Sequence, residues 1–256
     1  MIHPTAIVHS AARIDEGVSI GPYAVIGEHV SIAAGTTVGP HSVIEGWTEI
    51  GRDNRIFQFA SVGADPQDLK FHGEQSFLRI GDRNTVREFV TLHRGTEDGG
   101  GETVIGDDNL FMAYSHVAHD CRVGNRVILA NAATLAGHVV VDDHAILGGL
   151  SGVHQFTRIG SHAMISGGSV VVQDIVPFII AQGDRAKPAG LNLVGLKRRG
   201  FSDSTLHDLK TAYKLVFRSG LRLEEALAKV AAELDETPEL KTFTEFISNS
   251  HRGIAR

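Results

Sequence analysis

The sequence predicts a mostly β fold, a parallel β-helix of six-residue repeats, followed by an α-helical C-terminal region. An apolar residue stands at every sixth position over residues 2–62, again over 80–92 and, after one shift of phase, over 105–171. After Pro177 this pattern stops, and apolar residues follow the three-to-four-residue spacing of helices. We therefore expect a repeat domain over residues 1–180 and a helical domain over residues 181–256.

The repeat itself favours strands. Most of the repeated apolar residues are β-branched, and a period of six does not match the 3.6 residues of a helical turn. A six-residue unit cannot bury its apolar side alone, so it must stack on further copies of itself. Because each fully buried aliphatic side chain contributes roughly 1.5–3 kcal/mol, packing is sufficient to explain why this position is always apolar.

Composition limits the possible functions. The chain has 256 residues and a net charge of −6, so no overall positive field points to nucleic acid. Cys121 is the only cysteine, which excludes an intramolecular disulfide and suits a reducing compartment. The N-terminal stretch lacks a signal-peptide pattern, and no segment is long and apolar enough for a membrane span. We expect a cytoplasmic protein with no nucleic-acid partner and no stable membrane insertion.

The repeat resembles the hexapeptide-repeat acyltransferases over residues 2 to about 176. Members of that family form a left-handed β-helix with three hexads per coil and assemble as trimers. The resemblance therefore implies a left-handed parallel β-helix and a homotrimer.

Three hexads per coil bring hexads 18 residues apart onto one face of the helix. One such face consists of the hexads that begin at Val62, Leu92, Val117, Leu135 and Val153. It carries both interruptions of the repeat, at about 64–79 and 97–104. It also carries His93, His119, Gly137, His138 and His154, with His116 at its corner. Since adjacent coils lie about 4.8 Å apart, this face could hold an extended ligand.

His119 and Asp120 are adjacent in this cluster, and a carboxylate beside a histidine can fix the imidazole tautomer and stabilise the protonated ring. Most such pairs are merely solvated, but the clustering with two loops favours a site. A metal site is the rival interpretation, because histidine is the commonest metal ligand and trimeric hexapeptide-repeat carbonic anhydrases bind zinc. The His-Asp step and the helical tail fit that class poorly, so we predict no metal and no cofactor.

The two interruptions differ in composition. The first, ADPQDLKFHGEQ, contains Gln67, Asp68 and Lys70, whose amide, carboxylate and ammonium groups suit sugar hydroxyls and a phosphate. The second, EDGGGET, is glycine-rich, but no lysine or helix follows it at P-loop spacing. We therefore interpret the second as a mobile loop.

The C-terminal region predicts a short helix over residues 192–199 and three longer ones over about 206–217, 223–234 and 238–247. Their apolar faces would cover the open end of the β-helix, whose unpaired edge is a liability. A basic run at 197–199 could dock a phosphate or an acidic partner.

Several short strings together resemble one branch of the family, the UDP-N-acetylglucosamine O-acyltransferases of lipid A biosynthesis. They are PQDLK, LHRGT, SHVAHDC, LAGHV, VHQF, IAQGD and NLVGLKRRGF, and the resemblance covers essentially the whole chain. It implies transfer of an (R)-3-hydroxyacyl group from acyl carrier protein to the 3-hydroxyl of UDP-N-acetylglucosamine, the first step of lipid A biosynthesis.

The resemblance also implies roles for individual residues. His119 would be the general base, oriented by Asp120, and the backbone N–H of Gly137 would stabilise the oxyanion. Positions that contact the sugar nucleotide and the acyl-pantetheine match Gln67, Asp68, Lys70, His93, His116, His138, His154, Gln155, Asn192, Arg198 and Arg199. Gly167 lies where family members set acyl length, and a glycine leaves room for a longer chain. Val194 departs from the family pattern, which has an acidic residue there.

The resemblance implies that the acyl donor is acyl carrier protein, which the basic tail would dock. Cys121 lies at an inward position of the repeat, so we do not expect it to be a nucleophile that forms an acyl-enzyme. Two other classes stay open. One is an acetyl-CoA-dependent acetyltransferase or a binding module for another nucleotide sugar, and the other is a metal-dependent hydratase. The sequence also leaves open the acyl-chain length and whether the acceptor carries a 3-hydroxyl or a 3-amino group.

Overall fold

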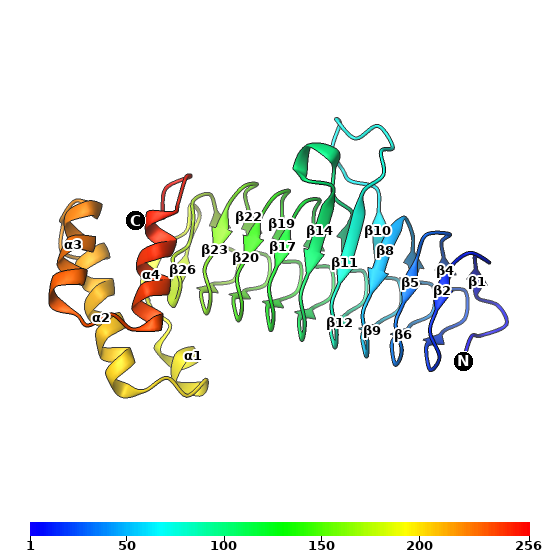
Figure 1. The fold of residues 1–256 in the computed structure, drawn as a ribbon, viewed down its shortest axis with the longest axis horizontal. Helices are drawn as coiled ribbons and strands as arrows, with labels where there is room; N and C mark the ends of the chain where they lie inside the picture. Colours follow the sequence, from blue (N-terminus) through cyan, green and yellow to red (C-terminus); the bar gives the residue numbers. More distant parts are fainter.

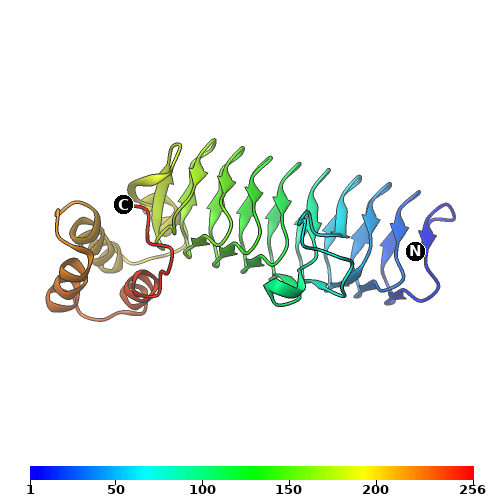
Figure 2. The same cartoon turned by 90° about the horizontal axis from the view of Figure 1, so that it is seen from above.

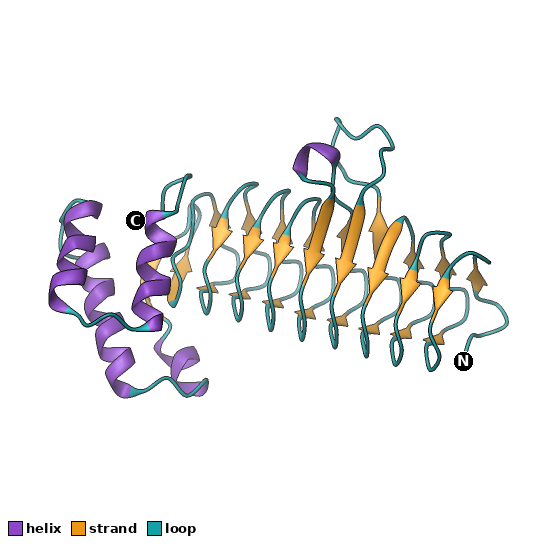
Figure 3. Cartoon of the chain, in the orientation of Figure 1, coloured by secondary structure: helices purple, strands orange, loops and turns teal.

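The computed structural model describes residues 1–256, and it confirms the predicted left-handed parallel β-helix with a helical C-terminal region. The chain passes through three sheets in turn, with one short strand in each sheet per coil (Figures 1 and 3). Because the inward residue of each hexad falls at the same point of its strand, every coil adds one aliphatic layer to the core.

The strands of the three sheets, in spatial order, are as follows. The first sheet contains β1 (Ile7–Val8), β4 (Val25–Ile26), β7 (Val43–Ile44), β10 (Ser61–Ala64), β13 (Thr91–His93), β16 (His116–Val117), β19 (Thr134–Leu135), β22 (Gly152–Val153) and β25 (Val170–Val171). The second contains β2 (Arg13–Ile14), β5 (Ser31–Ile32), β8 (Trp47–Ile50), β11 (Phe77–Ile80), β14 (Glu102–Ile105), β17 (Arg122–Val123), β20 (Val140–Val141) and β23 (Arg158–Ile159). The third contains β3 (Ser19–Ile20), β6 (Thr37–Val38), β9 (Arg55–Ile56), β12 (Thr85–Val86), β15 (Leu110–Phe111), β18 (Ile128–Leu129), β21 (Ile146–Leu147), β24 (Met164–Ile165), β26 (Ile179–Gln182) and β27 (Lys187–Leu191).

The register of the first sheet agrees with the stacking predicted from the repeat. The aligned positions run in the order Val62, Leu92, Val117, Leu135 and Val153, all in parallel pairs. Both interruptions of the repeat therefore leave the first sheet in consecutive coils. This brings the two loops side by side, as both views of the ribbon show (Figures 1 and 2).

The first loop is shorter than the sequence suggests, and the second has the expected length but lies three residues earlier in the chain. Strand β11 begins at Phe77 and β14 begins at Glu102, so the first loop covers 65–76 and the second covers 94–101, including a 3-10 turn at Glu97–Gly99. After each loop the strand begins three residues before the next repeated apolar position. These strands, β11 and β14, each pair along four residues with the preceding coil.

Each coil turns at three edges. The first edge joins the first sheet to the second, the second edge joins the second to the third, and the third edge joins the third to the first. Most turns hold a non-glycine residue in the left-handed region, such as Asp120 (φ 60°) and His138 (φ 59°) on the first edge and Asp108 (φ 59°) on the second. Aspartate, asparagine and histidine tolerate this backbone better than most residues, which favours polar columns along the edges.

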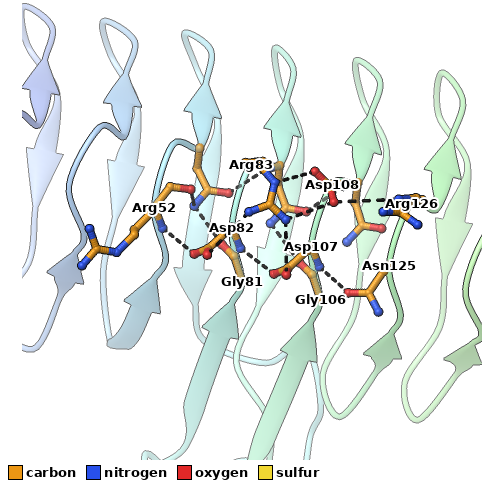
Figure 4. Close-up of polar contacts among 12 residues, drawn as sticks. Arg52, Gly81, Asp82, Arg83, Gly106, Asp107, Asp108, Asn125 and Arg126 are labelled. Atoms are coloured by element: carbon orange, nitrogen blue, oxygen red, sulfur yellow. Dashed lines mark hydrogen bonds and ion pairs between the residues drawn. The ribbon is translucent and has the colours of Figure 1, made fainter.

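The second edge contains one such column in its interior. The Asn84 backbone N–H donates to the Asn54 side-chain oxygen (2.8 Å), and the Asn109 N–H donates to the Asn84 side-chain oxygen (2.9 Å). On the surface above this ladder, the Arg83 guanidinium donates to Asp108 of the next coil (2.7 Å) and also pairs with Asp82 and Asp107 (Figure 4). The buried side-chain oxygens and backbone N–H groups of this column are paired with neighbouring coils.

The C-terminal region follows the sequence pattern closely. Strands β26 and β27 extend the third sheet past residue 180, and the helices are α1 (Leu193–Arg198), α2 (Asp203–Phe217), α3 (Leu223–Glu233) and α4 (Pro238–Ser248). Ser202 caps α2, where its hydroxyl accepts the Thr205 N–H, and Thr237 caps α4, where its hydroxyl accepts the Leu240 N–H. Helix α4 begins with a proline, as predicted. A domain boundary near residue 180 remains our proposal.

The helices lie beyond the last coil of the β-helix (Figure 1). The segment after α4 returns to that coil, where Ile254 and Ala255 are buried and Asp174 pairs with the returning chain. None of the helices has the length and apolar character needed to cross a membrane.

Candidate active site

His119 and Asp120 lie at the first edge, in the turn between β16 and β17. The His119 Nδ1 atom is 2.7 Å from the Asp120 Oδ2 atom, and both residues are buried. The left-handed backbone of Asp120 turns its carboxylate back toward the preceding imidazole. His119 Nε2 faces the first loop, 3.9 Å from Asp68 Oδ2. An imidazole held at one nitrogen by a carboxylate and free at the other has the geometry of a general base.

The Asp120 carboxylate is fully buried yet well supplied with donors. Its Oδ1 accepts the backbone N–H of Thr96 at 2.8 Å, and its Oδ2 accepts the Thr96 hydroxyl at 2.7 Å. Burial alone would raise the pKa of Asp120, but the hydrogen bonds from His119 and Thr96 outweigh it and hold that pKa below its usual value. Asp120 is therefore ionised at neutral pH, which fixes the His119 tautomer that carries its proton on Nδ1.

Gly137 lies in the next coil against the His119 ring. A Cβ atom at this position would lie 2.5 Å from His119 Cε1 and 2.6 Å from Nε2, so no other residue fits without moving the imidazole. The Gly137 carbonyl accepts from the Phe156 N–H (3.2 Å), whereas the Gly137 N–H has no acceptor in the protein. A buried N–H without a partner beside a basic nitrogen is suited to stabilising negative charge on a ligand.

Three further histidines surround the pair. His138 packs edge-on against His119 with ring centroids 5.2 Å apart, and His93 packs edge-on against His116 at 4.9 Å. Burial lowers the pKa of His93 and His138, and burial together with the neighbouring imidazoles lowers the pKa of His116 to about 4. These rings are therefore neutral at pH 7. Neutral rings can act as hydrogen-bonding groups without placing further positive charge beside His119.

The first loop brings two of its predicted residues over this edge. Asp68 and Lys70 line a cavity of about 580 Å³ between the two loops, together with Glu74, Thr96 and other loop residues. Asp68 is partly buried and accepts the backbone N–H of Lys70 at 3.0 Å, while the Lys70 side chain is exposed. The exposed Gln67 stands beside them in the chain.

Arg94 anchors the start of the first loop to the β-helix. Its buried guanidinium donates to the Gly63 carbonyl (3.0 Å), forms an ion pair with Asp65 and lies 5.3 Å from the Trp47 ring centroid. Because Asp65 is only three residues from Asp68, this contact holds the loop against the His119 edge. The sequence places Arg94 beside His93 but gives no signal that it clamps a loop.

His154 and Gln155 lie on the same edge, one coil beyond Gly137, and both are exposed. The returning C-terminal segment places Arg252 beside them, with its guanidinium 3.0 Å from His154 Nδ1 and 2.8 Å from the Val172 carbonyl oxygen. Arg252 is 98 residues from His154 in the chain, so no local pattern could indicate this contact.

The remaining predicted residues lie elsewhere in the chain. Asn192 caps α1 and donates to the His162 carbonyl at the second edge (3.0 Å), and Arg198 and Arg199 are on the same helix. Gly167 is exposed in a turn of the third edge, and a Cβ there would lie 3.2 Å from the Gly149 carbonyl oxygen. One chain therefore does not bring these four residues to the His119 edge. Val194, where the family pattern has an acid, is exposed on α1.

Donor atoms of His119, Asp120 and His138 lie within 4.8 Å of one another, which is close enough to hold a metal ion. However, His119 Nδ1 already donates to Asp120, and both oxygens of that carboxylate accept from Thr96. A metal would have to break these hydrogen bonds to gain its ligands. The absence of a metal stays a prediction, and the arrangement favours acid–base chemistry.

Comparisons with known proteins identify the family to which the chain belongs. A family model described as UDP N-acetylglucosamine O-acyltransferase, domain 2, matches residues 174–255, and a model of the bacterial transferase hexapeptide, six repeats, matches residues 102–137. Curated acyl-[acyl-carrier-protein]–UDP-N-acetylglucosamine O-acyltransferases from Janthinobacterium sp. (strain Marseille) and Herminiimonas arsenicoxydans are 56% and 57% identical to the chain. Each alignment covers 100% of this chain and 99% of the relative.

Solved structures give the same result. LpxA from Acinetobacter baumannii superposes with a TM-score of 0.96 at 45% identity, covering 100% of this chain and 99% of that one. LpxA from Bacteroides fragilis superposes with a TM-score of 0.97 at 42% identity, covering 100% of both chains. With relatives this similar over their full lengths, the chain belongs to the hexapeptide-repeat family of UDP-N-acetylglucosamine O-acyltransferases.

Proposed function

We propose that this protein transfers an (R)-3-hydroxyacyl group from acyl carrier protein to the 3-hydroxyl of UDP-N-acetylglucosamine, with His119 as general base. The observation that carries the proposal is the buried His119–Asp120 pair, 2.7 Å apart, beside the unpaired N–H of Gly137. The names of the full-length relatives supply the donor and acceptor classes. The geometry supports His119 as the base and the Gly137 N–H as the oxyanion donor.

The reaction is a direct attack. His119 Nε2 takes the proton of the sugar 3-hydroxyl while that oxygen adds to the thioester carbonyl carbon. The resulting oxyanion accepts the Gly137 N–H, and the ionised Asp120 stabilises the His119 imidazolium. Collapse of the tetrahedral intermediate breaks the C–S bond, and the imidazolium returns its proton to the departing thiolate. Burial raises the pKa of the Cys121 thiol to about 12, so this side chain is not a competing nucleophile.

The distribution of the predicted residues supports a ligand bound between copies of the chain. Asn192, Arg198 and Arg199 lie at the second edge, so they reach a ligand on the first edge only if it belongs to another copy. The third edge carries a stack of exposed aromatic rings that includes Phe59, Phe89 and Tyr114, which association would remove from water. We therefore propose a homotrimer, as the family resemblance implies, acting in the cytoplasm.

The test is a product analysis. Purified protein would be incubated with UDP-N-acetylglucosamine and 3-hydroxyacyl carrier proteins of graded chain length, and the products would be weighed by mass spectrometry. We expect a sugar nucleotide heavier by one hydroxyacyl group. His119→Ala should lower kcat by about 10²–10⁴-fold, while His9→Ala, exposed in the first coil, serves as the matched control.

Three other outcomes would overturn the proposal. A product formed only with the 3-amino sugar would change the acceptor, and one formed only with acetyl-CoA would change the donor class. Stoichiometric zinc, with activity lost on chelation, would replace the acid–base mechanism with a metal-dependent one. The length of the preferred acyl chain would also test the role of Gly167, which is expected to admit a long chain.

A further inference from the structure

The second loop covers the Asp120 carboxylate. Gly99 packs so closely on it that a Cβ at residue 99 would overlap the carboxylate carbon and both oxygens. The Asp120 side chain is completely shielded from water as a result. The glycine run that the sequence suggests is mobile thus forms a lid over the residue that orients the general base.

The lid is tied down by hydrogen bonds within the second loop and to the β-helix. Thr96 caps the 3-10 turn, where its hydroxyl accepts the Gly99 N–H (3.2 Å), and its carbonyl accepts the Gly101 N–H (2.8 Å). The Gly101 carbonyl accepts the Phe77 N–H at the start of β11 (2.8 Å). Gly100 and Gly101 both have left-handed backbones (φ 97° and 81°), which glycine adopts without strain.

Thr96 connects the second loop to the His119–Asp120 pair by hydrogen bonds. Its single hydroxyl proton points to Asp120 Oδ2, because an ionised carboxylate oxygen can only accept, and the hydroxyl oxygen in turn accepts the Gly99 N–H. The same Oδ2 atom accepts His119 Nδ1–H, so one oxygen joins the loop, the carboxylate and the imidazole. The Thr96 N–H holds the other oxygen, which prevents the carboxylate from rotating.

We propose that Thr96 is a positioning residue, acting through Asp120 to hold the His119 imidazole in its catalytic tautomer and orientation. This inference rests on His119 being the general base of the proposed function. Without the hydroxyl, the buried Oδ2 atom loses one of its two side-chain donors, and the carboxylate can turn about its remaining bonds. Thr96 contacts neither reacting atom, so its loss should change turnover and leave sugar-nucleotide binding largely unchanged.

The experiment compares Thr96→Val, which keeps the shape without the hydroxyl, with Thr96→Ser, which restores the hydroxyl. We expect Thr96→Val to lower kcat by about 10- to 100-fold, the effect of one hydrogen bond to a charged group, with KM for UDP-N-acetylglucosamine within about twofold. Thr96→Ser should recover most of the lost turnover. A threonine that only stabilised the loop would instead alter KM and the melting temperature.

A double-mutant cycle tests whether the loss of turnover in Thr96→Val is transmitted through Asp120. If Thr96 acts through Asp120, adding Thr96→Val to Asp120→Ala should cost less than about twofold more, because the intermediary is already gone. Independent, multiplicative losses in the cycle would overturn the inference. So would full activity of Thr96→Val, or a Thr96→Ser variant as slow as the valine variant.

A measurement without substrate keeps this test separate from the proposed function. In ¹⁵N-histidine-labelled protein, with His119→Ala used to assign the signal, the His119 nitrogens should report a proton on Nδ1. Thr96→Val should shift those signals toward a mixture of tautomers. Unchanged His119 signals in Thr96→Val would overturn the positioning role even if no acyl donor gave product. Failure of the acyl-transfer assay alone would overturn only the proposed function.

Discussion

The first and second edges of the β-helix use the same turn for different purposes. Both place a left-handed polar residue in successive coils, as Asp120 and His138 show on the first edge and Asp108 and Arg126 on the second. In the asparagine ladder of the second edge, each buried polar group has a partner in a neighbouring coil. On the first edge, His119 is held at Nδ1 only, and the Gly137 N–H has no partner.

The difference shows how one repeat provides both stability and a site. A buried polar group with a partner contributes modestly to stability, whereas one without a partner costs about 1–3 kcal/mol. The asparagine ladder of the second edge therefore adds to the free energy of unfolding. The first edge leaves donors and acceptors unpaired, and a ligand that pairs with them recovers this cost on binding. Substitutions at the first edge should thus change turnover, whereas substitutions in the asparagine ladder of the second edge should change the free energy of unfolding.

Among the substitutions that compare the two edges, the largest effect is expected at the first edge, for Gly137→Ala. The new Cβ would meet the His119 ring at 2.5 Å, so the imidazole must move out of its position beside Asp120. We expect kcat to fall by about 10²–10³-fold, a loss comparable to that of one oxyanion donor. Steady-state kinetics would measure the fall in kcat, and a binding assay would measure the affinity for UDP-N-acetylglucosamine.

Gly190→Ala is the matched control for this substitution. Gly190 lies in β27, and an alanine Cβ at this position would have no neighbouring atom within 4 Å, so activity and stability should stay close to wild type. Normal turnover in Gly137→Ala would show that the His119 ring can move without loss of function.

A smaller effect, on stability alone, is expected at the second edge for Asn84→Ala. The substitution removes the acceptor of the buried Asn109 N–H and the donor to the partly buried Gly106 carbonyl. We expect the free energy of unfolding to fall by about 2–4 kcal/mol, measured by denaturant titration. The kcat of the folded variant should stay within about twofold of wild type, because no group of the first edge changes. A large loss of turnover at unchanged stability would contradict the separation of the two edges.

Much of this organisation follows from the sequence, because a six-residue period sets both the strand positions and the register. The apolar spacing, combined with the three hexads per coil that the family resemblance implies, aligned Val62, Leu92 and Val117 across two loops. The asparagine ladder also has a sequence signal, since Asn54 and Asn84 each stand two residues before a repeated apolar position. The period carries this information because every coil repeats the same local environment.

The contacts that the sequence does not predict all involve segments outside the period. Thr96 reaches Asp120 from the second loop, Arg94 clamps the first loop, and Arg252 returns from the C-terminal segment to His154. Loop conformation depends on long-range hydrogen bonds rather than on a repeating pattern. The residues on these segments can be recognised as polar and close to the site, but their partners follow only from the three-dimensional structure.

The smallest predicted effect concerns the pH dependence of stability and distinguishes the imidazoles of the two edges. His162 lies at the second edge, where its ring stacks on His144 at 4.6 Å and packs against Phe178 and Phe201. Burial, with a smaller contribution from His144, lowers the pKa of His162 to about 4. Its Nδ1 atom is buried without a hydrogen-bond partner, so this imidazole has a structural rather than a proton-transfer environment.

The sign of the effect follows from proton linkage. In the unfolded chain, a histidine binds its proton below a pKa of about 6.5, whereas folded His162 stays neutral down to about 4. Unfolding between these values therefore takes up a proton, and stability falls as the pH is lowered from 6.5 toward 4. His162→Phe removes this group, and phenylalanine already occupies the equivalent left-handed position at Phe178 in the next coil (φ 70°). At pH 5, unfolding of the variant should take up about one proton fewer, seen as a shallower slope of unfolding free energy against pH. An unchanged slope would show that His162 is protonated in the folded protein. The contrast between a structural imidazole at the second edge and a ligand-facing imidazole, His119, at the first edge would then be wrong.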